Sequence, residues 1–127
     1  MSRHIKYALV DFDATLTFGD SYPDVASLNM EAIEVLKEFQ QRGGKVILGT
    51  AREGETLNIA LTRLGQADFY PDFANCNAPE RIAQYGADCR KYMADIFIDD
   101  RCIDFTGDWG YYRKVLIDQN DYFKEGL

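Results

Sequence analysis

A short apolar run that ends in two acids places the strongest constraint on how this chain can fold. Residues 7–10 are apolar, and Asp11 and Asp13 follow directly, with Phe12 between them. As the end of a buried strand over 5–10, this run would release both carboxylates at the sheet edge where open α/β proteins bind their ligands. Neighbouring carboxylates repel each other, so a fold that holds them together usually adds a cation or a proton. The pair therefore predicts a metal site at a strand tip.

The composition is that of a folded protein rather than a disordered segment. The chain has 127 residues, of which 46% are hydrophobic, so we expect a single domain over 1–127 with a core of its own. The net charge is −7, and without a basic cluster the chain is a poor partner for nucleic acids or anionic membranes. Cys76, Cys89 and Cys102 form no C-x-x-C pair, which favours reduced thiols and a cytoplasmic protein. We expect neither a signal peptide nor a membrane-spanning segment.

Short apolar runs alternate with amphipathic segments along the chain. Strands are expected at residues 5–10, 46–48, 69–74, 96–98 and 115–117. Helices are expected from an Asn29 cap to about residue 42, at 53–64 with Gly65 as its stop, and as one or two turns at 79–85. Strands that alternate with helices form a parallel sheet covered on both faces. The pattern predicts a three-layer α/β/α sandwich with a mostly parallel Rossmann-like sheet.

Polar residues with useful chemistry follow three of the expected strands. They are Asp11, Asp13, Thr50, Asp99 and Asp100. Right-handed crossovers bring the carboxyl ends of parallel strands to one sheet edge, so these side chains should lie close together. Carboxylates are hard oxygen ligands suited to Mg²⁺, while the Thr50 hydroxyl, nearby backbone N–H groups and Lys91 could hold a phosphate. The set predicts phosphoryl transfer with a carboxylate as the covalent nucleophile.

The same residues resemble the motifs of the haloacid dehalogenase superfamily. Asp11-Phe12-Asp13-Ala14-Thr15 is similar to its first motif, D-x-D-x-T, except that Ala14 stands where glycine is commonest. Leu48-Gly49-Thr50 resembles the second motif, and Ile96-Phe97-Ile98-Asp99-Asp100 resembles the fourth. Lys91 fits the third motif by position, with Lys45 and Arg90 as alternatives. The resemblance spans residues 5–101 and implies the same Rossmann-like fold.

The resemblance also implies how the acids divide the chemistry. Asp11 would be the nucleophile and a Mg²⁺ ligand. Asp13 would protonate the leaving oxygen and then activate water, and its backbone carbonyl would also ligate the metal. Asp99 would hold Mg²⁺ with support from Asp100. Because an aspartate at position 13 is the proton donor of the phosphatase branch, the resemblance implies a phosphomonoester hydrolase.

Substrate contacts are assigned to threonine and basic residues. By the resemblance, Thr50 would bind the transferring phosphoryl group and Lys91 would neutralise the nucleophile and the phosphate. Arg52 and Arg101 follow two of the strand tips and could contact the substrate or form surface ion pairs. These assignments make Thr50, Arg52 and Lys91 the expected substrate-binding residues.

Larger members of the superfamily carry a cap domain that this chain has no room for. Residues 18–28 and 75–90 are too short to fold as a cap, so we expect a capless member. Its open site would admit a large phosphorylated substrate or be closed by a second subunit of a homo-oligomer. The substrate class is left open by the sequence.

Two non-enzymatic readings compete with a phosphatase. A phospho-receiver domain has similar length and residue types, but its phosphorylated aspartate lies on a middle strand, with threonine and lysine on later ones. In this chain Thr50 follows the second expected strand, and the paired acids Asp99 and Asp100 follow the strand expected at 96–98. The other alternative is a degenerate member that binds phosphorylated partners without turnover.

Overall fold

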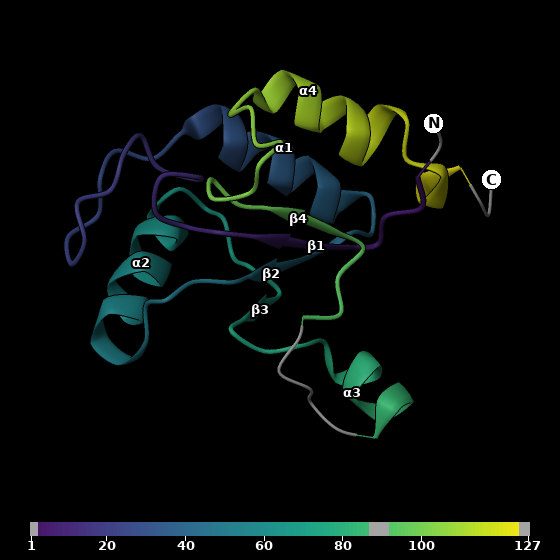
Figure 1. Ribbon diagram of the computed structural model, residues 1–127, viewed down its shortest axis with the longest axis horizontal. Helices are drawn as coiled ribbons and strands as arrows, with labels where there is room; N and C mark the ends of the chain where they lie inside the picture. Colours follow the sequence, from purple (N-terminus) through teal and green to yellow (C-terminus); the bar gives the residue numbers. More distant parts are fainter. Residues whose placement is uncertain (1–2, 87–91, 125–127) are drawn as a thin grey trace.

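A four-stranded parallel sheet forms the centre of the protein, described here from a computed structural model over residues 3–86 and 92–124 (Figure 1). The strands, in the spatial order β3-β2-β1-β4, are β1 (Tyr7–Val10), β2 (Lys45–Leu48), β3 (Phe73–Ala74) and β4 (Ile96–Ile98). The helices are α1 (Met30–Gln41), α2 (Gly54–Gln66), α3 (Pro79–Tyr85) and α4 (Trp109–Arg113), followed by the π-helical turn η1 (Lys114–Asp118) and the short helix η2 (Asp121–Phe123). All three strand pairings are parallel, as predicted.

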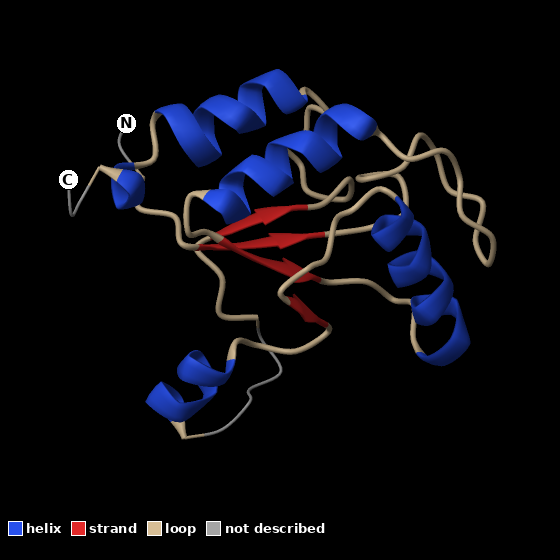
Figure 2. Cartoon of the chain, turned by 180° about the vertical axis from the view of Figure 1, so that it is seen from behind, coloured by secondary structure: helices blue, strands red, loops and turns tan. Residues whose placement is uncertain are grey.

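The central strand β1 is buried on both of its faces. Ala8 and Val10 belong to the main hydrophobic cluster, whereas Tyr7 and Leu9 belong to a smaller cluster on the opposite face. Helices α1 and α4 lie over the first face, and α3 lies beyond the second (Figures 1 and 2). Because side chains alternate along a strand, a strand covered on both sides needs apolar residues at every position. This explains the uninterrupted apolar run that precedes Asp11, and it confirms the α/β sandwich.

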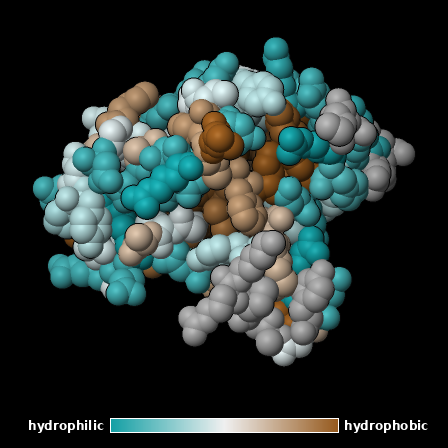
Figure 3. All heavy atoms as spheres, viewed as in Figure 1, coloured by the Kyte–Doolittle hydropathy of each residue, from teal (hydrophilic) through white to brown (hydrophobic). Residues whose placement is uncertain are grey.

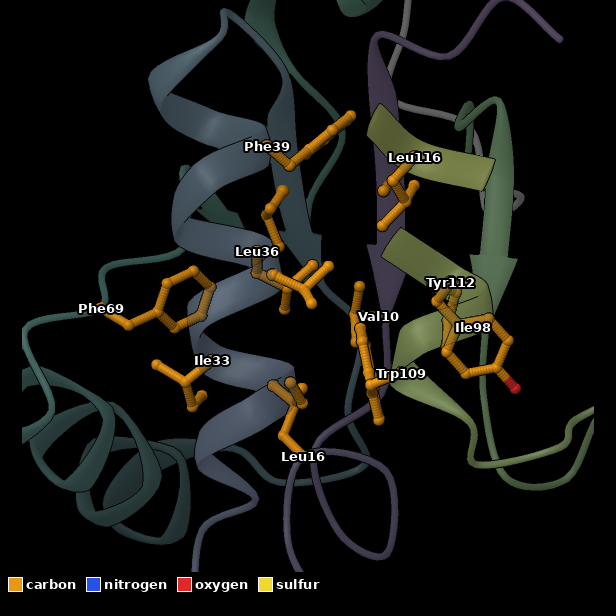
Figure 4. Packing of buried hydrophobic residues seen from close by; sticks show 14 of the residues in the cluster. Val10, Leu16, Ile33, Leu36, Phe39, Phe69, Ile98, Trp109, Tyr112 and Leu116 are labelled. Carbon is orange, nitrogen blue, oxygen red and sulfur yellow. The ribbon is translucent and has the colours of Figure 1, made fainter. Parts of the chain in front are cut away.

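Helix α1 packs one of its faces against the sheet. Asn29 caps it, with its side-chain oxygen accepting the Ala32 N–H at 3.3 Å. Its buried residues recur at helical spacing and include Ile33, Leu36 and Phe39. In Figure 4, Leu36 and Phe39 extend toward the strands, and Ile33 lies beside Phe69. The helix ends before Gly44, where a Cβ would lie only 2.5 Å from the Phe39 ring. The chain can therefore turn tightly against the end of α1 and enter β2.

The predicted strand at 115–117 is wrong, because this segment is helical. The Asp108 side chain accepts the Tyr111 N–H at 3.1 Å and starts α4, which continues into η1. Trp109, Tyr112 and Leu116, three and four residues apart, are buried in the main cluster. The β-branched residues suggest a strand, but packing of this helical face over the sheet decides the conformation. In a smaller difference, α2 continues through Gly65 to Gln66 instead of stopping at the glycine.

A buried asparagine joins the end of the chain to the start of β1. The Asn120 side chain accepts the Ile5 N–H at 2.9 Å and donates to the carbonyls of Ile5 and Leu116 at 2.7 and 2.8 Å. Asn120 is fully buried, so these bonds form away from competing water. They fix the helical segment after α4 relative to β1.

Strand β4 forms one edge of the sheet and carries apolar surface. Phe97 is 44% exposed, and Figure 3 shows hydrophobic residues at the surface over this strand. Within the described parts of the chain, no helix combines the length and the apolar character that crossing a membrane requires.

Candidate metal and phosphate site

Three carboxylates meet where β1 and β4 end side by side. Val10 pairs with Ile98, and the Asp11 N–H continues the ladder by donating to the Ile98 carbonyl at 2.9 Å. This register brings Asp11 next to Asp99 and Asp100, and one oxygen from each lies within 4.8 Å of the others. Carboxylate ligands of a small divalent cation are separated by up to about 4 Å. The three acids therefore need only a small contraction to hold one cation.

The electrostatics of this cluster favour a positive charge at its centre. Burial, a hydrogen bond with Asp100 and the charge of Asp99 raise the pKa of Asp11 from 3.8 to about 7. Without a cation, the cluster therefore retains a proton near neutral pH. A hard divalent cation would take the place of that proton and satisfy all three carboxylates. The donor set fits such an ion, as the sequence predicts for Asp11, Asp99 and Asp100.

Thr15 connects the two strand tips, although sequence reasoning assigned it no role. Its hydroxyl lies 3.4 Å from an Asp11 oxygen and 3.3 Å from an Asp100 oxygen, and it accepts the Asp100 N–H at 3.0 Å. Thr15 is 3% exposed, so these contacts are shielded from solvent. In the sequence, Thr15 could have been singled out because it is the threonine of the D-x-D-x-T motif. Its position shows that it holds Asp100 against Asp11.

Asp13 does not join the three-acid cluster. Both of its side-chain oxygens accept N–H groups of Arg52, each at 2.8 Å. The Arg52 side chain is 1% exposed and that of Asp13 is 16% exposed, so the ion pair is largely buried. The structure thus gives the two acids of the opening motif different partners. The predicted metal contact of the Asp13 carbonyl stays a prediction.

Thr50 lies beside the cluster, on a loop that Asn75 holds in place. The Thr50 N–H donates to the Asn75 side chain at 2.9 Å, and the same side chain donates to the Arg52 carbonyl at 2.9 Å. The Thr50 hydroxyl accepts the Arg52 N–H at 3.1 Å, which leaves its own proton available. Sequence reasoning missed Asn75. It could have been noticed as a polar residue that directly follows the strand expected at 69–74.

A cleft of about 760 Å³ opens over these residues. Its lining comprises the acids Asp11, Asp13, Asp20, Asp99 and Asp100, together with Leu9, Tyr22, Gly49, Thr50, Ala51, Arg52, Tyr92, Phe97 and Arg101. The volume exceeds what a metal ion and a phosphate fill, so the cleft also has room for a substrate's leaving group. Aromatic rings form part of its wall.

The basic residues considered from the sequence lie in different places relative to the cleft. Lys91 and its alternative Arg90 lie outside the described residues. Lys45 begins β2 and lies 3.9 Å from Asp72, at the sheet edge opposite the strand tips, so it does not reach the site. Among the described residues that line the cleft, the basic ones are Arg52 and Arg101.

Comparison with known proteins places the chain beside one solved structure. No protein-family model and no curated protein matches it. A solved structure, described as the conserved protein coded by locus from Bacteroides thetaiotaomicron, is 32% identical, with a TM-score of 0.78. The match covers 90% of this chain and 91% of that one. The two proteins therefore share their fold over nearly their full compared lengths, and this chain belongs to the same family as the Bacteroides thetaiotaomicron protein.

Proposed function

We propose that this protein is a Mg²⁺-dependent phosphomonoester hydrolase that works through an aspartyl-phosphate on Asp11. The observation that carries the proposal is the three-acid cluster at the tips of β1 and β4, beside the Thr50 hydroxyl in one cleft. Acidic residues alone are common on surfaces. Here, however, the pKa of Asp11 is raised to about 7 by burial and neighbouring acids, as expected where a site is arranged for a cation.

The chemistry divides into two displacements at phosphorus. An Asp11 oxygen attacks the phosphorus atom, and the bond between phosphorus and the leaving oxygen breaks while Asp13, which enters this step in its protonated form, gives that oxygen a proton and becomes the carboxylate paired with Arg52. Water then attacks the aspartyl-phosphate, Asp13 takes a proton from it, and the Asp11–phosphorus bond breaks to release inorganic phosphate. Mg²⁺ held by Asp11, Asp99 and Asp100 would neutralise charge on the transferring group.

The cleft supplies the remaining contacts with the phosphoryl group. The Thr50 hydroxyl has its proton free to donate to a phosphoryl oxygen, since the contact from the Arg52 N–H uses only its oxygen. Arg101 is exposed at the cleft, and we assign it a contact with the bound phosphate or the leaving group. Lys91 keeps its predicted role of neutralising the phosphate.

We also propose that the protein works in the cytoplasm on a phosphorylated compound. Cys76 and Cys102 are free thiols in the structure, and reduced cysteines are typical of that compartment. The open cleft supports a substrate whose leaving group extends past the strand tips towards the aromatic residues.

A panel of phosphomonoesters tests this function. Phosphate release is measured for sugar phosphates, nucleotides, phosphopeptides and an aryl phosphate, in Mg²⁺ and in EDTA. We expect turnover of at least one class in Mg²⁺ only, and its loss in Asp11→Asn. The matched control is Asp118→Asn, because Asp118 is an exposed acid paired with Arg113. A phosphate-binding domain without catalysis would bind these compounds with no release, and activity that survives in Asp11→Asn would overturn the mechanism.

A further inference from the structure

Arg52 uses all of its side-chain donors inside the protein. Two N–H groups bind the Asp13 carboxylate, and the other three hydrogen bonds go to backbone carbonyls: Pro23 at 3.0 Å, Thr56 at 3.2 Å and Asp24 at 2.6 Å. A guanidinium group has five N–H donors, so none is left over. A substrate phosphate could bind Arg52 only by displacing one of these bonds.

Aromatic rings hold the guanidinium group as well. Its central carbon lies 5.2 Å from the centre of the Phe12 ring and 5.1 Å from that of the Tyr22 ring. Cation–π contacts of this kind are strongest where water is excluded, and the Arg52 side chain is 1% exposed. Arg52 is therefore fixed by the strand tip that carries Asp13 and by the loop that carries Tyr22.

We propose that Arg52 is a positioning residue: it sets the orientation of the Asp13 carboxyl group and couples that group to the loop over residues 18–28. This inference rests on the proposed phosphatase function. It assigns Arg52 a role through Asp13 in place of direct contact with the substrate.

The geometry explains why such a residue is needed. The carboxyl group of an aspartate rotates easily about its last bond. The planar Arg52 fork engages one lone pair of each Asp13 oxygen and stops this rotation, while the other lone pairs stay available. Asp13 lines the cleft and keeps 16% of its side chain exposed. The exposed side is thus held at a constant angle toward a leaving group.

The loop shares the same anchor. Arg52 binds the carbonyls of Pro23 and Asp24, and the neighbouring Tyr22 ring lines the cleft. A bridge between Thr17 and Leu28 closes the base of this loop. The proton donor and a wall that faces the leaving group are consequently positioned by one side chain. Loss of Arg52 should therefore affect the step in which the leaving group departs.

The test compares two leaving groups. Para-nitrophenyl phosphate releases a stable anion and needs little proton donation, whereas glycerol phosphate releases an alkoxide that needs a proton. Arg52→Gln should lower kcat for glycerol phosphate about 100-fold, the scale of a misplaced proton donor, and kcat for the aryl ester only a few-fold. Arg52→Lys, which keeps the charge but lacks the fork, should show a smaller loss with the same preference.

Three further variants make the result specific. Asp13→Asn should show the same selectivity between leaving groups, and the double variant with Arg52→Gln should be no worse than Asp13→Asn alone, since both changes remove one function. Arg113→Gln is the matched control: Arg113 donates to both Glu38 oxygens, at 2.8 and 2.9 Å, between α4 and α1. It should leave the ratio of the two kcat values unchanged.

The outcomes separate the inference from the proposed function. Equal losses for both esters in folded Arg52→Gln, judged by circular dichroism, would mean a structural role only and would overturn the inference. If Arg52→Gln does not fold, the same ratio in Arg52→Lys decides. The ratio is measured for the aryl ester and for whichever alkyl ester of the panel the unmodified protein hydrolyses. Absence of Mg²⁺-dependent turnover of every phosphomonoester in the panel by the unmodified protein would instead overturn the proposed function, and the inference with it.

Discussion

Replacement of Asp11 by asparagine should stabilise the metal-free protein at neutral pH while it abolishes activity. The pKa of Asp11 is raised from 3.8 to about 7 by burial, the hydrogen bond with Asp100 and the charge of Asp99. The folded protein therefore keeps a proton that the unfolded chain has already released. In that situation the free energy of unfolding falls as pH rises between the two values. Asparagine has the same shape and does not titrate.

The magnitude follows from the size of the pKa shift. A shift of about three units at about 1.4 kcal/mol per unit gives an upper bound of about 4 kcal/mol. Asp11 is only half-buried, and solvent screening reduces the effect to about 2 kcal/mol. Deprotonation of Asp11 destabilises the metal-free unmodified protein. This loss of stability is absent below pH 3.8, grows between pH 3.8 and about 7, and is complete above that. It should disappear in Mg²⁺, because the cation replaces the proton.

Urea unfolding in EDTA measures this effect across the pH range. The quantity of interest is the free energy of unfolding of Asp11→Asn minus that of the unmodified protein, since titration of other groups largely cancels. We expect this difference to increase by about 2 kcal/mol from acidic to neutral pH. Saturating Mg²⁺ should reduce it or reverse its sign. A difference that stays constant with pH would refute the claim that the three-acid cluster holds a proton without metal.

Three other changes test separate parts of the structure. Ala14 has a positive φ of 64°, so Ala14→Gly should raise the free energy of unfolding by about 1 kcal/mol, measured in urea; a loss would contradict the strain. Thr15→Val leaves the Asp100 N–H without its acceptor and should weaken Mg²⁺ binding several-fold by calorimetry; unchanged affinity would remove Thr15 from the site. Asn120→Leu should cost about 3 kcal/mol in urea, and a neutral result would contradict the anchoring of Ile5.

The elements around β1 were predictable because local signals and tertiary packing agree there. An apolar run long enough for a strand ends in Asp11, and a second one ends in Asp99. The structure places these runs side by side as β1 and β4, so their acids meet. Asn29 likewise caps α1, as its residue type predicts. In each case the residues carry their own signal within a few positions of the chain.

Other features depend on contacts that no local pattern contains. The pairing of Asp13 with Arg52 joins residues 39 positions apart and needs the loop carbonyls that also bind the guanidinium. The helical form of 115–117 depends on burial over α1 and the sheet, which the β-branched side chains do not reveal. Lys91 lies outside the described residues, so its role stays a prediction.

Binding of beryllium fluoride, followed by fluorine NMR, tests the central claim most directly. In the presence of Mg²⁺, this anion forms a phosphoryl-like adduct with a nucleophilic carboxylate and does not require a substrate to be known. Asp11 as the nucleophile predicts protein-bound fluorine signals in Mg²⁺ that are absent in EDTA and in Asp11→Asn, and present in the Asp118→Asn control. Bound signals that persist in Asp11→Asn, or no bound signal from the unmodified protein in Mg²⁺, would contradict the account.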